Sequence, residues 1–188
     1  MNKITKIALP AILFLSAVGC GKEKNDGKPD STKIPETISE AVLSDIPASL
    51  LLGARPENPI GIAEIKKTAK PGDKLTIKGE VGGRKNDTFN SSLAIFLLED
   101  PTVVVNCSKK EKDGCPTPWD YCCEPKAKLL EAGALIQVKD ARGEIVRKTL
   151  KGWNGLKELD NVVIVGKLSN DSSEGNFIVD AEGVFIEK

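Results

Sequence analysis

Apolar side chains recur at every second position along much of the chain. Between residues 74 and 81, Leu75, Ile77 and Val81 alternate with polar residues, which is the pattern of a strand with one buried face. Similar short apolar runs, separated mostly by turn residues, follow at residues 92–98, 135–146, 162–168 and 177–186. The pattern predicts at least five strands with little room for long helices, and hence a mainly β fold.

Helical spacing is confined to short segments. Apolar residues recur every fourth position between residues 38 and 46, before a proline ends that piece. Residues 60–70 form a second candidate helix, and residues 126–132, which follow a proline and are rich in helix formers, form a third. We therefore predict a helical or irregular lead-in over residues 35–70 and a β domain over residues 71–188.

Two glycines lie inside predicted strands. Gly79 and Gly166 would permit the sharp bending that lets a short sheet close on itself. With these glycines, the order of strands over residues 71–188 resembles the OB-fold, which implies a five-stranded barrel with short helices; a β-sandwich of similar strand count is the alternative. We expect Ile77 and Val165 to lie on the apolar face of their strands.

The N-terminus has the organisation of a secretory signal. A short basic head precedes an apolar run at residues 7–15, and small residues lead up to Cys20. The apolar run is short of the roughly 20 residues that a spanning helix needs. Residues 17–20 resemble a bacterial lipobox, which implies a signal peptide over residues 1–19 and a lipid on Cys20; an uncleaved anchor or ordinary secretion is the alternative.

Lipid modification of Cys20 would place the protein on a membrane of the cell envelope, facing the periplasm or the exterior. Residues 21–33 contain no large apolar side chain, so burial cannot offset the entropy lost on ordering them. We predict a flexible tether over residues 20–34 and, through the lipid, a membrane as one partner.

Histidine is absent from the 188 residues. Its absence excludes Ser-His-Asp and Cys-His catalysis and every histidine-ligated metal. The 27 basic and 27 acidic side chains balance, and removing Lys3 and Lys6 with the signal leaves 25 against 27, a net charge of −2. A nucleic-acid partner needs a basic surplus on one face, so we expect none. We also expect no cofactor, and a small-molecule or protein ligand as the second partner.

The remaining cysteines share one segment, the cysteine loop of residues 107–125. It contains four cysteines, one of two tryptophans and the only tyrosine, namely Cys107, Cys115, Cys122, Cys123, Trp119 and Tyr121. In an exported chain an even number of cysteines predicts disulfides, here two. Bonding Cys122 to Cys123 would strain a small ring, so the crossed and nested connectivities are preferred.

A thiolate metal site or a redox centre is the alternative use of the same four cysteines. Four thiolates suit zinc, copper(I) or an iron–sulfur cluster. Against a metal, the loop has no Cys-x-x-Cys pair, and we expect the side chains of Cys122 and Cys123 to diverge. Against redox exchange, Lys126 is the only flanking base. Asp120 and Glu124 are expected to be solvated or capping groups.

The segment Cys115-Pro-Thr-Pro-Trp119-Asp-Tyr121-Cys122-Cys123 resembles a motif in a family of uncharacterised exported proteins of planctomycete-like bacteria. The stretches at residues 71–73, 82–84 and 150–152 are also similar to that family. The resemblance implies an exported lipoprotein and implies no particular activity.

A second candidate surface follows the first predicted strand. Arg84 and Lys85 come after two glycines, and with Trp119 and Tyr121 they could form a surface for a ligand. A solvated turn and an aromatic lid packed on the barrel are the plainer alternatives. Glu99, Asp100 and Asp140, at the ends of other strands, could line the same surface. Asp100, Asp120 and Asp140 could in principle support acid–base catalysis, but surface carboxylates are common in this chain. We therefore expect a non-catalytic binding or structural module.

Overall fold

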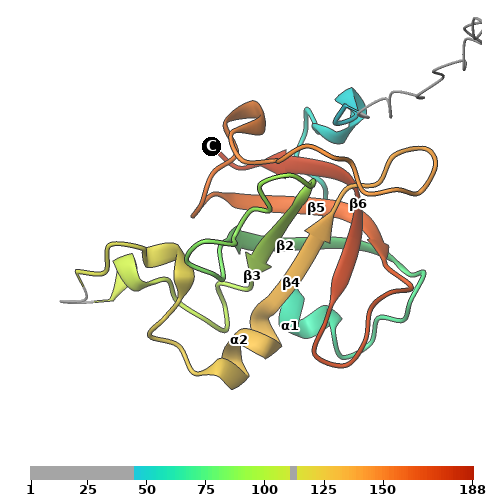
Figure 1. Cartoon of the computed structure of the whole chain (residues 1–188). Helices are drawn as coiled ribbons and strands as arrows, with labels where there is room; N and C mark the ends of the chain where they lie inside the picture. The colour runs from blue at the N-terminus through green and yellow to red at the C-terminus, as the bar shows by residue number, and fades with distance from the viewer. Residues whose placement is uncertain (1–44, 111–113) are drawn as a thin grey trace, which may run out of the picture. The chain divides into compact units, whose positions relative to one another are not determined.

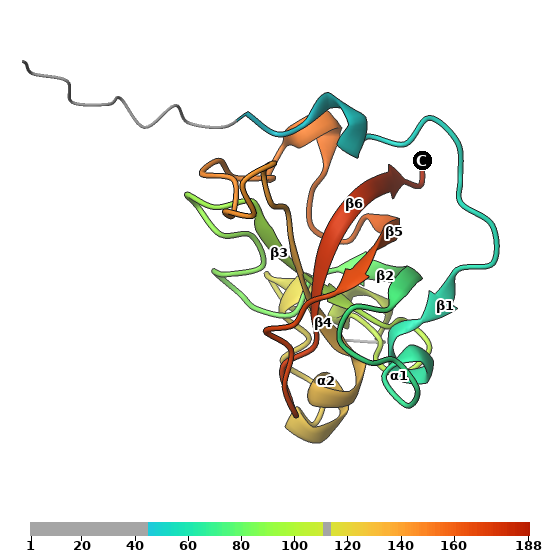
Figure 2. The same cartoon turned by 90° about the vertical axis from the view of Figure 1, so that its right-hand side faces the viewer.

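Five strands close into a barrel in the computed structural model, which describes residues 45–110 and 114–188 (Figures 1 and 2). The strands are β2 (Lys74–Val81), β3 (Ile95–Glu99), β4 (Gly133–Gln137), β5 (Asn161–Leu168) and β6 (Ile178–Ile186). Their order around the barrel is β2, β3, β4, β6 and β5, and β5 pairs again with β2. Only β4 and β6 run parallel among these pairs. This order confirms the predicted mainly β, OB-fold-like five-stranded barrel.

The other elements of the described part are short. Strand β1 (Ile60–Gly61) adds to β2 in parallel, and α1 (Ile62–Ile65) follows it directly. Helix α2 (Lys126–Ala132) has the bounds that the sequence predicts. The remaining helical turns are 3₁₀ turns, η1 (Ala48–Leu50), η2 (Cys107–Lys109), η3 (Pro118–Asp120) and η4 (Trp153–Gly155). No helix within residues 45–110 and 114–188 has the length and hydrophobicity of a membrane span.

The predicted signal peptide, Cys20 and the tether lie outside the described residues. The structure therefore leaves the lipid anchor as a prediction from sequence.

The barrel interior is filled by alternate residues of each strand. Ile77, Phe96, Ile136 and Ile164 are all completely buried in one apolar cluster. Val165, which we expected on the apolar face, is only half-buried and lies outside that cluster. The four residues 162–165 are all apolar, so alternation along this run does not reveal which of them face inward.

Gly79 and Gly166 lie where neighbouring strands approach most closely. A Cβ at Gly79 would stand 2.6 Å from Leu98 Cγ and 2.8 Å from the Glu99 carbonyl oxygen. At Gly166 a Cβ would collide with the carbonyl oxygen of Asp180, and the β5–β6 register shifts beside this residue. Both glycines therefore serve the close strand contact that barrel closure requires.

A candidate metal centre in the cysteine loop

The cysteine loop belongs to the long connection between β3 and β4, and Figure 1 shows it projecting to one side of the barrel. Cys107 begins η2, and Cys122 and Cys123 follow η3 before the chain enters α2. The two ends of the β3–β4 connection lie close together beside the barrel, because β3 and β4 are adjacent antiparallel strands.

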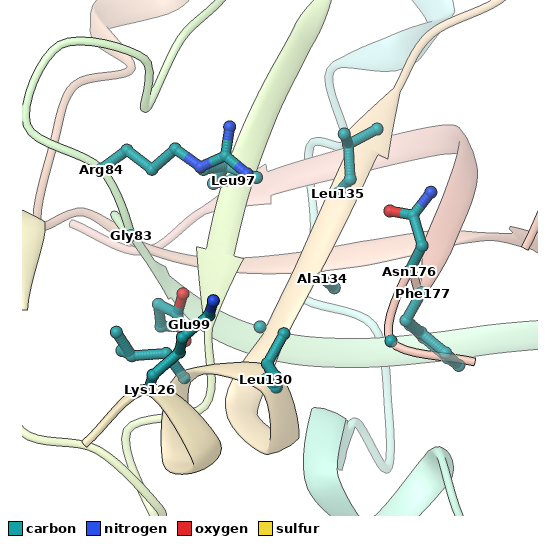
Figure 3. A pocket seen from close by; sticks show the side chains of 13 residues that line it. Gly83, Arg84, Leu97, Glu99, Lys126, Leu130, Ala134, Leu135, Asn176 and Phe177 are labelled. Carbon is teal, nitrogen blue, oxygen red and sulfur yellow. The ribbon is translucent and has the colours of Figure 1, made fainter. Parts of the chain in front are cut away.

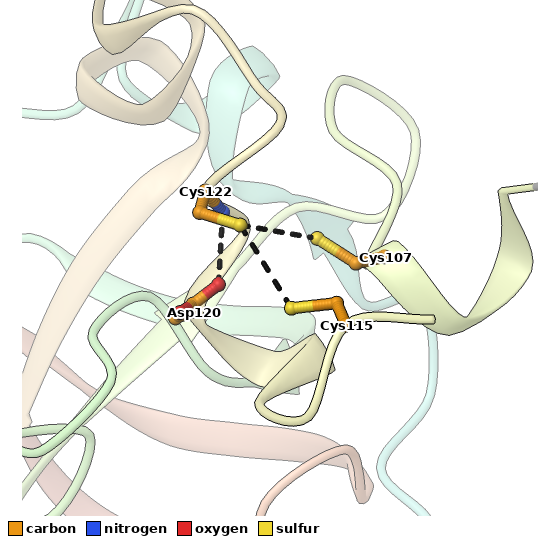
Figure 4. A group of neighbouring side chains, drawn as sticks. All are labelled: Cys107, Cys115, Asp120 and Cys122. Atoms are coloured by element: carbon orange, nitrogen blue, oxygen red, sulfur yellow. Dashed lines mark hydrogen bonds between the residues drawn. The ribbon is translucent and has the colours of Figure 1, made fainter. Parts of the chain in front are cut away.

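Local hydrogen bonds set the turn that precedes Cys122. Pro118 opens η3 with its φ fixed for a helical turn. Thr117 Oγ1 donates to Asp120 Oδ2 at 2.8 Å, and the backbone N–H of Cys122 donates to Asp120 Oδ1 at 2.9 Å. Tyr121 takes a left-handed conformation with φ of 52°. The sharp turn at Tyr121 directs Cys122 back toward Cys107 and Cys115, as Figure 4 shows.

The sulfur atoms of the other three cysteines surround that of Cys122. Its Sγ lies 3.8 Å from that of Cys107, 3.9 Å from that of Cys115 and 3.8 Å from that of Cys123. Cys107 and Cys123 are closer to each other, at 3.2 Å. These distances exceed the S–S bond length of about 2.05 Å, so none of the four described cysteines is disulfide-bonded in this structure.

The expectation that the side chains of Cys122 and Cys123 diverge is wrong, because their sulfur atoms lie only 3.8 Å apart. Asp120, expected to be solvated or capping, also belongs to the cluster. The Sγ atoms of Cys107, Cys115 and Cys122 and one carboxylate oxygen of Asp120 all lie within 4.8 Å of one another. The structure thus offers four thiols and one carboxylate as candidate ligands.

The cluster is open on one side. Cys107 is buried and Cys115 is half-buried, whereas Cys122 and Cys123 are exposed. Hydrogen bonding to Asp120, and then to the other three thiols, raises the pKa of the Cys122 thiol above its ordinary value. Crowded thiols favour their protonated forms, so a cation that binds here must displace protons.

A buried carboxylate ties the loop to the barrel. Glu80 of β2 is 2 % exposed and accepts hydrogen bonds from Asn106 Nδ2 at 2.5 Å, Tyr121 Oη at 2.6 Å and Lys109 Nζ at 2.7 Å. Burial alone would raise the pKa of Glu80, but the donors of Lys109, Tyr121 and Asn106 outweigh it and lower the pKa below its usual range. Because Asn106 and Tyr121 directly precede Cys107 and Cys122, these bonds position two of the four cysteines.

Backbone contacts complete the attachment of the loop. The N–H of Gly83 donates to the Trp119 carbonyl at 2.8 Å. A Cβ at Gly82 would stand 2.7 Å from that carbonyl oxygen and 2.7 Å from the Tyr121 ring. Only glycine at position 82 therefore lets the loop lie flat on the end of β2.

The predicted ligand-surface residues separate in the structure. Tyr121 is completely buried, so it forms the packed lid and not a platform for a ligand. Trp119 is half-buried, and its Nε1 donates to the Lys85 carbonyl at 3.2 Å. Arg84 instead lines a cavity with Glu99, whereas Lys85 and Trp119 line a different one.

The candidate catalytic carboxylates each serve a local structure. Asp100 accepts hydrogen bonds from the N–H groups of Ala63 and Thr102, which fixes the start of α1 and the turn after β3. Asp140 accepts bonds from the backbone of its own turn and pairs with Arg142. Asp120 holds the turn before Cys122. The structure gives no acid–base pair from these three residues.

Glu80 is the site residue that sequence reasoning missed. Its place in the alternation of β2 indicates a solvent-facing side chain. Burial comes from loop residues that lie 26 to 41 positions away in the chain. A glutamate beside Gly82-Gly83 was the available signal, because those glycines mark a close approach of another segment.

Comparison with known proteins found no matching family model, no similar curated protein and no similar solved structure. The fold and the site define a mainly β barrel that displays a cluster of four cysteines.

Proposed function

We propose that this chain is a lipid-anchored cell-envelope protein whose cysteine loop binds one thiophilic metal ion, with Zn²⁺ as the ion that suits its donors best. The equal spacing of three sulfur atoms around Cys122, at 3.8 to 3.9 Å, is the observation that carries the proposal. Four thiolates held about 2.3 Å from one ion at tetrahedral positions lie about 3.8 Å from one another.

The donor set favours zinc over other ions. Sulfur ligands exclude magnesium and calcium, and a nearby carboxylate is compatible with zinc but not with the soft copper(I) ion. Cys107, Cys115 and Cys122 supply three thiolates, and the fourth donor is Cys123 or Asp120. The exposed side of the cluster favours an exchangeable ion over the closed site of a structural zinc.

The anchor and the compartment belong to the same proposal. The lipobox resemblance at residues 17–20 supports attachment through Cys20 and a barrel held at a membrane surface. Asp100, Asp120 and Asp140 each hold local structure in the described part of the chain, which supports a binding role over an enzymatic one. The proposed protein holds or passes on zinc at the envelope.

Zinc competition with a chromophoric chelator tests the proposal on the full chain. We expect one Zn²⁺ per chain, with Cys122→Ser weakening the affinity by more than about 100-fold, beyond the 10–100-fold typical of outer-shell changes. Equal zinc affinity in the parent and in Cys122→Ser would refute the site.

The fourth donor is found by comparing Cys123→Ser with Asp120→Asn. The substitution that removes the fourth ligand should weaken zinc affinity as much as Cys122→Ser does. The other substitution should weaken it by no more than the 10–100-fold typical of outer-shell changes. Asp140→Asn is the matched control, because Asp140 also accepts a hydrogen bond at 2.9 Å from the N–H two residues later but lies outside the cluster. Asp140→Asn should leave zinc binding unchanged.

Two nested disulfides, Cys107–Cys123 and Cys115–Cys122, are the second candidate. The 3.2 Å between the sulfur atoms of Cys107 and Cys123 favours it, since this is the shortest distance measured in the cluster, and an oxidising compartment would support it. Thiol titration of unfolded protein distinguishes the two. With Cys20 blocked by its lipid, a metal site yields four thiols once a chelator is added, whereas two disulfides yield these thiols only after reduction.

A further inference from the structure

A cavity of about 240 Å³ lies over β3 and β4, and no residue of the cysteine cluster lines it. Helix α2 and the β5–β6 connection form its sides, as Figure 3 shows. Among its lining residues are Arg84, Leu97, Glu99, Lys126, Leu135 and Phe177. Its volume falls just below the roughly 300–1,000 Å³ of drug-sized pockets, so a small ligand fits it.

Glu99 forms an unpartnered polar group in this cavity. The residue is 5 % exposed, and its Oε2 is buried without a hydrogen-bond partner in the described part of the chain. Buried polar atoms are almost always hydrogen-bonded, so a lone one requires an explanation. A ligand atom in the cavity would supply the missing partner.

The backbone on both sides leaves room for the Glu99 carboxyl group. A Cβ at Gly83 would stand 2.7 Å from Glu99 Oε1, and a Cβ at Gly133 would stand 3.2 Å from the same oxygen. Gly83 also has a φ of 130°, a backbone conformation that residues other than glycine rarely adopt. Because Gly83 and Gly133 have no side chains, the Glu99 carboxyl group stays uncovered and in contact with the cavity.

The charge around the cavity is positive. Arg84 and Lys126 line it, and in the described residues neither pairs with a carboxylate. Lys66 stands nearby but donates to the carbonyl oxygens of Leu130 and Glu131 at the end of α2. Two cations without partners and a buried carboxyl group suit an anionic ligand.

The walls of the cavity are apolar. Leu97 and Leu135 come from the outer faces of β3 and β4, and Phe177 comes from the β5–β6 connection. Leu130 of α2 lines the cavity too and is 52 % exposed, which is unusual for a leucine in this domain. These side chains would bury the non-polar part of a ligand.

We propose that this cavity binds a small organic anion that joins a carboxylate to an apolar body. Arg84 and Lys126 hold the carboxylate. The protonated Glu99 carboxyl group donates a hydrogen bond to it. The apolar body packs against the leucines and Phe177.

The protonation of Glu99 follows from its surroundings. Burial raises the pKa of Glu99 to about 8, Lys66 opposes this rise and Asp100 adds to it. The carboxyl group is therefore largely neutral near pH 7 and ionised in alkaline solution. The charged or titratable groups around it are Lys66 after α1, Asp100 after β3, Arg84 after β2, Lys126 of α2 and Tyr121 of the cysteine loop.

Benzoate is the probe, with neutral benzamide and cationic benzylamine as comparisons, measured by titration calorimetry on the full chain. We expect saturable benzoate binding with a Kd of about 1 mM or tighter, and weaker binding of both comparison compounds. Raising the pH from about 6.5 to about 9.5 should weaken benzoate binding at least tenfold, because ionised Glu99 repels the carboxylate.

Two variants and one control define the site. Arg84→Ala should weaken benzoate binding about tenfold or more, through loss of one charged contact. Glu99→Gln keeps a hydrogen-bond donor, so it should bind benzoate near neutral pH and lose most of the pH dependence. Lys85→Ala removes an adjacent exposed charge outside the cavity and should leave binding unchanged.

Three results would overturn the proposal. They are the absence of saturable benzoate binding at millimolar concentrations, tighter binding of benzylamine than of benzoate, and equal losses in Arg84→Ala and Lys85→Ala. None of these variants replaces a cysteine or Asp120, and benzoate binding is measured separately from zinc binding.

Discussion

Glu80 shows how much of this structure depends on a single side chain. It is one carboxylate near the end of a barrel strand, yet it accepts hydrogen bonds from Asn106, Lys109 and Tyr121, in or next to the cysteine loop. A buried charge is stabilising only when donors surround it. The loop and the carboxylate therefore stabilise each other.

Replacing Glu80 by glutamine tests this dependence. Glu80→Gln keeps the shape but loses the charge, so it should lower the free energy of unfolding by about 1.5–3 kcal/mol, the range for hydrogen bonds to charged groups. Urea unfolding near pH 7 measures the loss. The control is Glu182→Gln, whose exposed pair with Lys167 is worth at most about 1 kcal/mol. Equal effects of the two variants would contradict the role of Glu80.

The same carboxylate gives a pH dependence. The pKa of Glu80 is lower in the folded state than in the unfolded chain, where it is about 4.3. Its contribution is therefore present above that unfolded value and is lost as the pH falls through the lowered folded pKa. The stability difference between the parent and Glu80→Gln should shrink in acid, which urea unfolding from neutral to acidic pH would show.

Glu99 predicts the opposite trend. Its folded pKa of about 8 exceeds the unfolded value of about 4.3. The protonated form is favoured by folding, so this contribution is complete below the unfolded pKa and is lost as the pH rises through about 8. Thermal unfolding of Glu99→Gln across this window should show a flatter pH dependence than the parent. Parallel curves would mean that Glu99 ionises normally in the folded protein.

Elements of the barrel could be predicted from the sequence because their signals are local. The alternation in residues 74–81 and the glycines at 79 and 166 report burial and bending within one strand. The inward face of β5 could not be predicted, because Val162, Val163, Ile164 and Val165 are all apolar.

Aspartate substitutions on β5 test the observed register. Ile164 is completely buried in the core, so Ile164→Asp should place an unpaired charge there and unfold the domain. Val165 is half-buried, and Val165→Asp should melt well above Ile164→Asp. Thermal melts followed by circular dichroism compare the two variants. A lower melting temperature for Val165→Asp than for Ile164→Asp would mean that Val165 faces the barrel interior.

The cysteine loop could be recognised as one chemical unit, but its geometry could not be read from spacing. The positions of the sulfur atoms depend on the left-handed Tyr121 and on the contacts of Glu80, which join segments far apart in the chain. No pattern in the sequence specifies those contacts. The disulfide interpretation was the natural one from compartment and cysteine number alone.

Gly82→Ala tests whether the loop must lie against β2. The new methyl group would stand 2.7 Å from the Trp119 carbonyl oxygen, so the loop should shift, lowering both the melting temperature and the zinc affinity. Gly53→Ala is the matched control, since nothing lies within 4 Å of its added Cβ. Melting curves and chelator competition measure both properties. Unchanged zinc affinity in Gly82→Ala would mean that the cluster does not depend on this contact.

For the whole molecule, the proposal joins an anchor, a barrel and a metal-binding loop. Cys20→Ala should abolish lipid labelling and release the protein from membranes, which metabolic labelling and fractionation would measure. Cys107→Ser is the control, because it alters the cluster without altering residues 17–20. Continued labelling of Cys20→Ala would refute the lipobox assignment.

The proposed zinc site, with Cys107, Cys115 and Cys122 as ligands and Cys123 or Asp120 as the fourth donor, can be observed as bound metal. Native mass spectrometry of the full chain, purified from the envelope without reductant or chelator, tests it most directly. We expect a native mass that exceeds the acid-denatured mass by one zinc ion less the displaced protons, with four alkylatable thiols after acidification. A mass that acid leaves unchanged and that rises by four hydrogens on reduction would contradict the metal site and establish two disulfides.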